Sequence, residues 1–224
     1  MGGSMFNKGK WAGARAKGLK VKGAIKNNVV FYRAESQAIS LTNMIPNGSF
    51  ETNTTGWAGS GTLSRIAVPA PVHGEFGSWC GQNAHKVNGA HYIQLSSALS
   101  GIVSGRKYYI RSRVRFAING YGNVIQFYNA ANALANGVTA YTMPAVNTWY
   151  VYDALWTAPN ANNVQLRFNF SNGSGNNDRT GQIDNIMMLD LTTAFGAGNE
   201  PDAATMKTLI ENEGYWDGTK VIQW

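Results

Sequence analysis

Apolar and polar residues alternate along two segments of the chain with the period of two expected of a half-buried β-strand. Residues 107–116 and residues 164–170 both show this pattern. In the first segment, the polar face is a row of cations formed by Lys107, Arg111, Arg113 and Arg115. Shorter apolar runs, separated by turns rich in Gly, Asn and Pro, lie at residues 92–95, 124–128, 149–156 and 182–189. The pattern predicts a β-sandwich between Ile39 and Leu191.

The C-terminal segment, residues 192–224, departs from the strand pattern. Residues 205–213 are predicted to form a short helix, because Pro201 and Asp202 precede them and Gly214 follows them. The apolar side of this helix is formed by Met206, Leu209 and Ile210. The sequence therefore predicts that a short helical segment follows the sandwich.

Charge is distributed unevenly along the 224 residues, which carry a formal net charge of +7. Residues 1–40 contain eight basic residues and one acidic residue, and the remaining 184 residues contain 11 of each. The basic character therefore belongs to an N-terminal arm, and the sandwich has no nucleic-acid signature. The predicted units are the arm at residues 1–38, the sandwich at residues 39–191 and the C-terminal segment at residues 192–224.

The arm is rich in Lys and Gly, and its repeated glycines argue against a helix. Alone, residues 6–27 are expected to be disordered, and residues 29–32 carry a short strand signal. The arm has two interpretations: it docks onto an acidic surface of a partner protein or packaged nucleic acid, or it is a solvated basic tail. Docking is favoured because isolated apolar residues interrupt the charges. The predicted anchoring residues are Lys8, Lys10, Trp11, Arg15, Lys17, Lys20, Lys22 and Lys26.

The sequence contains few groups that suggest catalysis. Its three histidines show no metal-ligand spacing, and no Gly-x-Ser-x-Gly nucleophile motif occurs. The single cysteine, Cys80, allows no intrachain disulfide, and beside Trp79 it is expected to be a small buried residue. No apolar run approaches the roughly 18 residues that span a bilayer. We therefore expect neither an enzyme nor a membrane-spanning protein.

Two motifs carry a resemblance to a known family. The first, Asn-Met-Ile-Pro-Asn-Gly-Ser-Phe-Glu at residues 43–51, is followed by Gly-Trp at residues 56–57. The second is Gly-Gln-Ile-Asp-Asn-Ile-Met-Met at residues 181–188. Together they resemble the opening and closing strands of jelly-roll carbohydrate-binding modules of families four, nine and twenty-two. The resemblance implies an all-β jelly-roll sandwich, to which the charge distribution adds an extended basic N-terminal arm and the helix signals add a short C-terminal helix.

The resemblance also implies one structural calcium ion where the first and last strands of the sandwich run side by side. The matching carboxylates are those of Glu51 and Asp184. Two carboxylates with backbone carbonyl oxygens suit a hard cation that takes about six to eight oxygen ligands. The alternative is that both residues cap turns or pair with arginine.

Sugar binding requires exposed aromatic rings that stack on the C–H faces of pyranose rings, and polar side chains that bond the hydroxyls. Core packing is an equal alternative for each aromatic residue, and Trp57, Tyr108 and Trp149 match core positions of the family. The cation row has three interpretations: a site for an anionic glycan, a contact with an acidic neighbour, or a solvated face. The predicted ligand-binding residues are Trp79, Tyr121, Tyr128, Trp156, Arg111 and Arg113.

Residues 190–201, Asp-Leu-Thr-Thr-Ala-Phe-Gly-Ala-Gly-Asn-Glu-Pro, resemble a segment that recurs in tail and fibre proteins of bacteriophages and prophages. In those proteins it directly follows such a sandwich and leads into a short helix. Nothing around its Gly-x-Gly completes a phosphate-binding loop. We therefore expect a tight turn and a helix cap here rather than catalysis.

The two resemblances together suggest a structural or decoration protein on the surface of a bacteriophage particle. Its arm would anchor it to capsid or tail proteins, and its sandwich would attach to cell-surface glycans. A homo-oligomer in the particle is expected, with nucleic acid contacted only through the arm. The alternatives are a capsid or tail assembly component that binds no sugar, and a binding module from a bacterial glycoside hydrolase.

Overall fold

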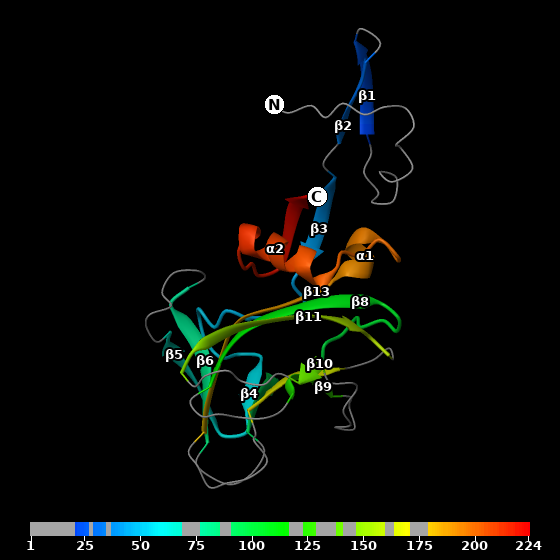
Figure 1. Cartoon of the computed structure of the whole chain (residues 1–224). Helices are drawn as coiled ribbons and strands as arrows, with labels where there is room; N and C mark the ends of the chain where they lie inside the picture. The colour runs from blue at the N-terminus through cyan, green and yellow to red at the C-terminus, as the bar shows by residue number, and fades with distance from the viewer. Residues whose placement is uncertain are drawn as a thin grey trace.

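The computed structural model of the chain contains two five-stranded antiparallel sheets that lie face to face (Figure 1). It describes residues 21–26, 29–34, 37–68, 77–85, 91–116, 123–128, 138–140, 147–159, 164–170 and 179–224. Two short helices and a two-stranded ribbon lie against one outer face of this sandwich, and a separate hairpin lies beyond them. The predicted all-β jelly-roll sandwich with a short C-terminal helix is confirmed.

The first sheet, which we call the long sheet, has the strand order β11-β8-β13-β6-β5. Its strands are β11 (Trp149–Thr157), β8 (Lys107–Phe116), β13 (Arg179–Asp190), β6 (Trp79–His85) and β5 (Thr62–Ala67). The alternation predicted for residues 107–116 is confirmed in β8, where Tyr108, Ile110 and Val114 are fully buried in the core between the sheets. The residues that alternate with them, including the cation row, point to the opposite face.

The second sheet, which we call the short sheet, has the strand order β10-β9-β12-β7-β4. Its strands are β10 (Val138–Ala140), β9 (Asn123–Tyr128), β12 (Gln165–Asn169), β7 (Tyr92–Leu95) and β4 (Trp57–Gly59). Apolar residues of its inner face, such as Ile93, Phe127 and Phe168, complete the core. The core position expected for Trp57 is confirmed, since its ring centroid lies 5.3 Å from that of Phe50.

A second hydrophobic cluster lies on the outer face of the long sheet. It is formed with the sheet by four elements: α1 (Leu191–Phe195), α2 (Ala203–Glu213), β14 (Thr219–Gln223) and β3 (Ala38–Thr42). We call these four elements the C-terminal cap. Because β3 pairs with β14, residues that precede the sandwich in sequence complete the cap that follows it.

The helix predicted for residues 205–213 is confirmed as α2, which begins two residues earlier than expected. Asp202 is its N-cap, and its Oδ1 accepts a hydrogen bond from the N–H of Thr205 at 2.8 Å. Gly214 ends the helix with a φ of 75°, a conformation that glycine adopts without strain. No helix in the described part of the chain is long and apolar enough to cross a membrane.

Part of the basic arm is ordered as a hairpin of β1 (Val21–Lys26) and β2 (Val29–Ala34). Disorder was the expectation up to residue 27, and it is wrong for β1, because every residue of β1 is paired in register with one of β2. The strand signal at residues 29–32 is confirmed in β2. Of the predicted anchoring residues, Lys22 and Lys26 lie in β1. The others, Lys8, Lys10, Trp11, Arg15, Lys17 and Lys20, lie outside the described residues.

Candidate functional site

Asn43 joins the opening motif of the sandwich to its closing strand. Its Nδ2 donates to the backbone oxygens of Ile186 at 3.2 Å and Trp216 at 3.1 Å. Its Oδ1 accepts from the backbone N–H groups of Ile45 at 3.1 Å and Met188 at 3.0 Å. Both ends of this buried amide are therefore fully used. The opening and closing motifs lie side by side, as the resemblance implied.

Gly48 allows these two motifs to approach closely. The N–H of Ile186 donates to the carbonyl oxygen of Gly48 at 3.1 Å. A Cβ atom at residue 48 would lie 2.3 Å from the Ile186 oxygen and 2.9 Å from the Tyr215 hydroxyl, so only glycine fits. Phe50 and Asn185, which flank the contact, have φ angles of 56° and 50°. Non-glycine residues adopt such angles where surrounding contacts impose them, often at functional sites.

Glu51 and Asp184 are the two carboxylates implied as calcium ligands, and they lie at this junction. Glu51 Oε1 accepts from the N–H of Ser78 at 3.0 Å and from that of Trp79 at 3.1 Å. Asp184 is 2% exposed, and its Oδ1 accepts from the N–H of Asn185 at 2.8 Å. Each carboxylate is therefore held in place by backbone donors.

The surroundings of Asp184 suit a cation. Burial raises the pKa of its carboxyl group to about 8; Asn185 and Arg113 act against this shift, and the charge of Glu51 adds to it. The side-chain amide of Asn185 is buried and forms no hydrogen bond within the described residues. Two carboxylates and an amide oxygen are the kind of ligands that Ca²⁺ takes. The described residues hold no cluster of three His, Cys, Asp or Glu, so backbone or water oxygens would complete the shell.

Arg65 binds the opening motif and covers one face of Trp79. Its Nε donates to the carbonyl oxygen of Phe50 at 2.7 Å, and its Nη2 donates to the carbonyl oxygen of Glu51. The guanidinium carbon lies 3.7 Å from the centroid of the Trp79 ring. Trp79 is half-buried. A sugar would therefore have to stack on the ring face that Arg65 does not cover.

Two residues of the cation row of β8, Arg111 and Arg113, are covered by this chain's own residues. Arg111 is 9% exposed, and its Nη2 lies 3.6 Å from Glu211 Oε1 on α2. Arg113 is 7% exposed, and its guanidinium carbon lies 5.6 Å from the centroid of the Trp149 ring. The prediction that Arg111 and Arg113 face a ligand is therefore wrong. The acidic neighbour, one of the three interpretations of this row, is the C-terminal cap itself.

Trp156 is a core residue. It is 5% exposed, and its ring stacks on that of Phe127 at a centroid distance of 4.0 Å. The prediction that Trp156 binds ligand is wrong, because its position in β11 faces inward. Tyr121 lies outside the described residues. Tyr128 is the last residue of β9, where it is paired in register with Gln165.

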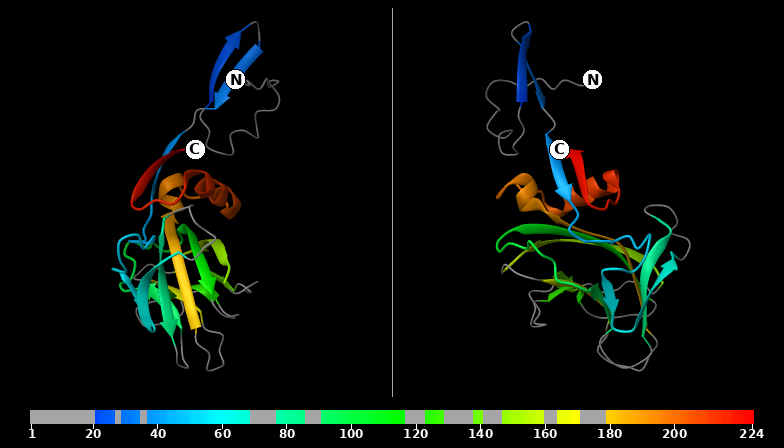
Figure 2. Two further views of the ribbon diagram at one scale, coloured as in Figure 1. Left: turned by 90° about the vertical axis from the view of Figure 1, so that its left-hand side faces the viewer. Right: turned by 180° about the vertical axis from the view of Figure 1, so that it is seen from behind.

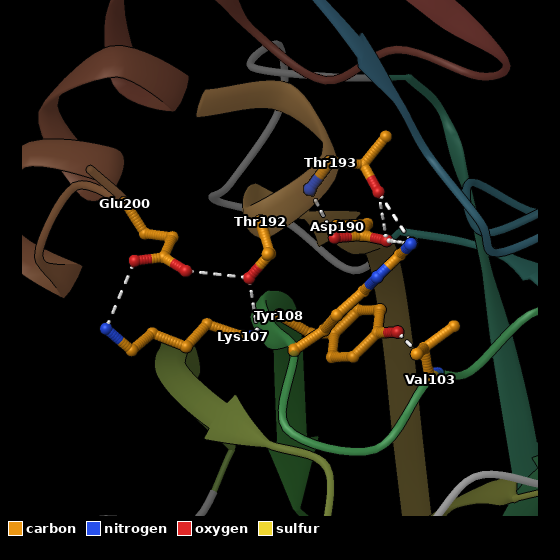
Figure 3. Close-up of polar contacts among 8 residues, drawn as sticks. Val103, Lys107, Tyr108, Asp190, Thr192, Thr193 and Glu200 are labelled. Carbon is orange, nitrogen blue, oxygen red and sulfur yellow. Dashed lines mark hydrogen bonds and ion pairs between the residues drawn. The ribbon is translucent and has the colours of Figure 1, made fainter. Parts of the chain in front are cut away.

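The tight turn and helix cap expected in residues 190–201 are confirmed (Figure 3). Asp190 is the N-cap of α1, and its Oδ1 accepts from the N–H of Thr193 at 2.9 Å. Its Oδ2 pairs with Nη1 of Arg106 at 2.8 Å, so the cap of the helix is tied to the start of β8. The segment of residues 190–201 is thus docked on the sandwich at its first residue.

Glu200 fixes the other end of the same segment (Figure 3). Its carboxylate accepts from the Thr192 hydroxyl at 2.8 Å, from the N–H of Gly198 at 2.9 Å and from Lys107 Nζ at 3.2 Å. Burial alone would raise the pKa of Glu200, but these hydrogen bonds outweigh it and lower the pKa. The carboxylate therefore serves as an ionised structural acceptor.

A polar surface that was not singled out from the sequence lies on the outer face of the short sheet. The inner face is fully buried at Ile93, Leu166 and Phe168. The residues between them, which point outward, are mostly amides. This outer face includes Tyr92, Gln94, Gln165, Arg167 and Asn169, which are half-buried, and Gln126, which is only 7% exposed. We call these six residues the amide face.

Side chains of the amide face hold one another across three strands. Arg167 Nε donates to Gln94 Oε1 at 2.7 Å, and its guanidinium carbon lies 4.1 Å from the centroid of the Tyr92 ring. Asn169 Nδ2 donates to Gln126 Oε1 at 3.4 Å. The face therefore presents amides, one aromatic ring and one cation in fixed positions, which is the mixture that binds polar ligands with hydroxyl groups.

Comparisons with known proteins concern the fold. No protein-family model and no curated protein matches the sequence. An arabinose-bound GH51 α-L-arabinofuranosidase is similar at 16% identity and a TM-score of 0.50, over 75% of this chain and 29% of that one. The enzymatically active domain of tailspike protein 4 from bacteriophage CBA120 is similar at 18% identity and 0.48, over 66% and 21%. A family 16 carbohydrate-binding module is similar at 19% identity and 0.46, over 66% and 100%.

The architecture defines a class of fold, an antiparallel jelly-roll β-sandwich. Modules of families 4 and 22, two of the families that the sequence resembles, are also among the similar structures. The chain spans less than a third of the arabinofuranosidase and tailspike chains that it matches.

Proposed function

We propose that this chain is a structural protein of a bacteriophage particle whose sandwich binds glycans on the bacterial cell surface. The observation that carries the proposal is the division of the molecule into two opposite sides (Figure 1, Figure 2). The hairpin of β1 and β2 and the C-terminal cap lie on the outer side of the long sheet. The amide face lies on the outer side of the short sheet. One side can therefore attach to a particle while the other contacts a ligand.

The phage assignment rests on residues 190–201, the segment that resembles those of tail and fibre proteins. In this chain Asp190 and Glu200 bind the segment to Arg106 and Lys107, the residues that lead into β8. The segment is therefore a fixed joint between the sandwich and the cap. Such a joint suits a protein that holds its binding module in one fixed orientation on a particle.

Glycan binding is assigned to the amide face. Amide side chains can donate to and accept from sugar hydroxyls, and an aromatic ring can pack on the apolar face of a pyranose. Gln94 and Tyr92 supply these two chemistries within one strand, β7. Ligand contacts at Tyr121, at Tyr128 and at the uncovered side of Trp79 on the long sheet are proposed separately from this face.

A calcium ion is proposed at the junction of the two motifs. Glu51 and Asp184 would hold it, with Asn185 close enough in sequence to contribute an amide oxygen. The ion would neutralise the buried charge of Asp184 and hold the opening motif against β13. Its role would be structural.

The basic arm is proposed to attach the chain to the particle. Lys22 and Lys26 in β1 continue the positive charge that the sequence concentrates in residues 1–40. Positive charge favours approach to an acidic surface of a capsid or tail protein. Several copies on one particle would bind a cell surface far more tightly than one copy, through multivalency.

The test is binding of the full chain to a panel of bacterial cell-wall and capsular polysaccharides. We expect saturable binding that Tyr92→Ala weakens about tenfold or more, because the variant loses the ring and the support of Arg167. Phe195→Ala, in the cap, is the matched aromatic control and is expected to bind like the unchanged protein. If the folded protein binds no polysaccharide, the sandwich is an assembly element, which is the structural alternative.

A further inference from the structure

We propose that two copies of the chain pair through β11, so that their long sheets join into one sheet across a two-fold axis. β11 is an edge strand of the long sheet, and in the described part of the chain it pairs with β8 alone. All nine of its residues are in continuous register with β8. We call the edge of β11 that points away from β8 the distal edge. A long and regular edge of this kind can pair with another strand.

The backbone groups on the distal edge belong to residues whose side chains face outward. The N–H of Ala158, which follows β11, donates to the carbonyl oxygen of Arg106 at 3.0 Å. Because this direction alternates along an antiparallel strand, Val151 and Leu155 turn their backbone groups toward the distal edge. Their side chains lie on the outer face of the long sheet, since Tyr152 between them faces the core.

The side chains of Val151 and Leu155 are large, apolar and exposed. Val151 is 40% exposed and Leu155 is 37% exposed. Only two other large apolar residues, Val103 and Val221, are classed with them as exposed in the described part of the chain. The sequence of β11 contains no proline or lysine, the residues that commonly protect an edge strand from pairing. Pairing at the distal edge would cover both apolar side chains.

The residue pattern of β11 selects a second copy of the same strand as the partner. When Asp153 lies on the two-fold axis, Val151 of each copy faces Leu155 of the other. Trp149 faces Thr157 in the same way. A shift by two residues would place Asp153 opposite Val151 or Leu155 instead. Apolar pairs therefore favour the register with Asp153 on the axis.

The two Asp153 carboxylates that meet on the axis have cations beside them. Arg111 of β8 is the cross-strand partner of Asp153 within each copy. Burial raises the pKa of the Asp153 carboxyl group; the charges of Lys207 and Arg111 act against this shift, and that of Glu211 adds to it. Like charges directly opposite each other still weaken pairing, so the contact on the axis limits the affinity of the dimer.

The dimer keeps the two sides of the molecule apart. With the axis perpendicular to the joined sheet, both C-terminal caps lie on one side and both amide faces on the other, the division that Figure 1 shows for one copy. Two copies would then present their amide faces in one direction. Pairing itself does not depend on glycan binding.

The first test is sedimentation of the full chain in the analytical ultracentrifuge over a range of concentrations. We expect a dimer that Leu155→Lys weakens about tenfold or more, because an ammonium group then faces Val151 at two symmetric positions. Asp153→Asn should strengthen it about two- to fivefold by removing the repulsion on the axis. Val221→Lys, an exposed apolar position in β14, is the matched control and should change nothing. A monomer at every concentration, or a dimer that Leu155→Lys leaves intact, overturns the proposal and leaves the proposed function in place.

Cysteine cross-linking tests the register. Opposite residues of a hydrogen-bonded antiparallel pair have Cα atoms about 5.5 Å apart, a separation that a disulfide spans. Asp153→Cys should therefore link two copies under mild oxidation, and Val151→Cys should do so only in combination with Leu155→Cys. The unchanged protein is the control, because its single cysteine, Cys80, is buried. Linking of Val151→Cys alone as readily as Asp153→Cys would overturn the register, and linking of neither Asp153→Cys nor the double variant would overturn the interface.

Discussion

Polar residues alternate with apolar ones in both β8 and β12, but the two outer faces that they form differ in the folded protein. On the long sheet, β8 turns a row of cations outward. Glu200, between α1 and α2, pairs with Lys107, and Glu211 of α2 pairs with Arg111. On the short sheet, β12 turns Gln165, Arg167 and Asn169 outward, where they donate hydrogen bonds to Leu95, Gln94 and Gln126 of neighbouring strands. The first face is largely an internal interface, with Arg111 and Arg113 buried, whereas most polar side chains of the second are half-buried.

This difference shows that residue type alone does not locate a binding face. Arginine and aromatic residues are good ligand-binding candidates, yet Arg111 and Trp156 are both covered by other parts of the same chain. The amide face contains fewer conspicuous residues, and it lies on the side of the molecule away from the cap. Substitutions on the two sides should therefore separate stability from ligand affinity.

The largest effect is expected on the cap side, from Asn43→Ala. This change removes four buried hydrogen bonds that join the opening motif, β13 and the cap. We expect the free energy of unfolding, measured by urea denaturation, to fall by about 3–5 kcal/mol. Asn199→Ala, at an exposed position, is the control and should change it by less than about 0.5 kcal/mol. A loss below about 1 kcal/mol for Asn43→Ala would show that these four hydrogen bonds are not essential for stability.

The next effect concerns Asp184 and the pH dependence of stability without calcium. The pKa of Asp184 is about 8 in the folded protein and close to 4 in an unfolded chain, so between these values only the folded state holds the proton. In a chelator, stability should therefore fall as pH rises, by on the order of 2–3 kcal/mol from about pH 5 to about pH 7. Added calcium should reduce the fall, because it binds the ionised form.

Asp184→Asn is the matched control for this pH dependence, which thermal unfolding at a series of pH values measures. The variant has no titrating carboxyl group at that position, so its stability should change little over the same range. It should also lose the response to calcium. An unchanged pH slope in Asp184→Asn would assign the titration to another group.

A smaller effect is expected from Glu200→Gln, which weakens the attachment of the cap to β8. The Glu200 side chain is 4% exposed and accepts from three donors, including Lys107. We expect a loss of about 1–2 kcal/mol in chemical denaturation. Glu211→Gln is the matched control, because the Glu211 side chain is 49% exposed, and its loss should stay below about 0.5 kcal/mol. Equal losses for the two variants would contradict the role of Glu200 in attaching residues 190–201 to β8.

The smallest change in stability is expected on the other side, from Gln94→Ala. This half-buried residue should contribute less than about 1 kcal/mol to folding, and its loss should weaken glycan binding severalfold. Arg113→Gln should do the reverse, destabilising the protein without changing glycan affinity at a temperature where it is folded. Calorimetric titration with a bound polysaccharide measures both affinities. Loss of affinity in Arg113→Gln alone would reverse the assignment of the two faces.

Local patterns in the sequence were sufficient for several elements of the fold. The alternation in β8 and the helix signals around α2 depend on residues close in sequence, and both were predicted correctly. The family motifs at residues 43–51 and 181–188 predicted one long-range contact, between the opening and closing strands. Asn43 makes this contact through hydrogen bonds to Ile186 and Met188. The interpretation of residues 190–201 as a turn and helix cap also required only local residues.

The site depended on contacts that the sequence does not display. Which face of β8 the cap would cover could not be read from β8 itself, so Arg111 and Arg113 were assigned to ligand. The contact of Arg167 with Gln94 spans 73 positions and exists only because β12 and β7 are neighbours in the sheet. Register between distant strands is set by the assembled sheet, and the six residues of the amide face meet only there.

The ribbon of β3 and β14 gives the molecule a defined path for mechanical load. Gln37 and Trp224 exchange backbone hydrogen bonds of 3.0 and 2.8 Å at the end of the ribbon away from the sandwich. Tension entering from the hairpin would run along β3 toward Asn43, parallel to the paired strand β14. All rungs of the ladder, from Ala38↔Gln223 to Thr42↔Thr219, would then be sheared together instead of opening one after another. Rupture under such a load is governed by the rate of unfolding, so this ribbon would keep a particle tethered while fluid flow pulls on it.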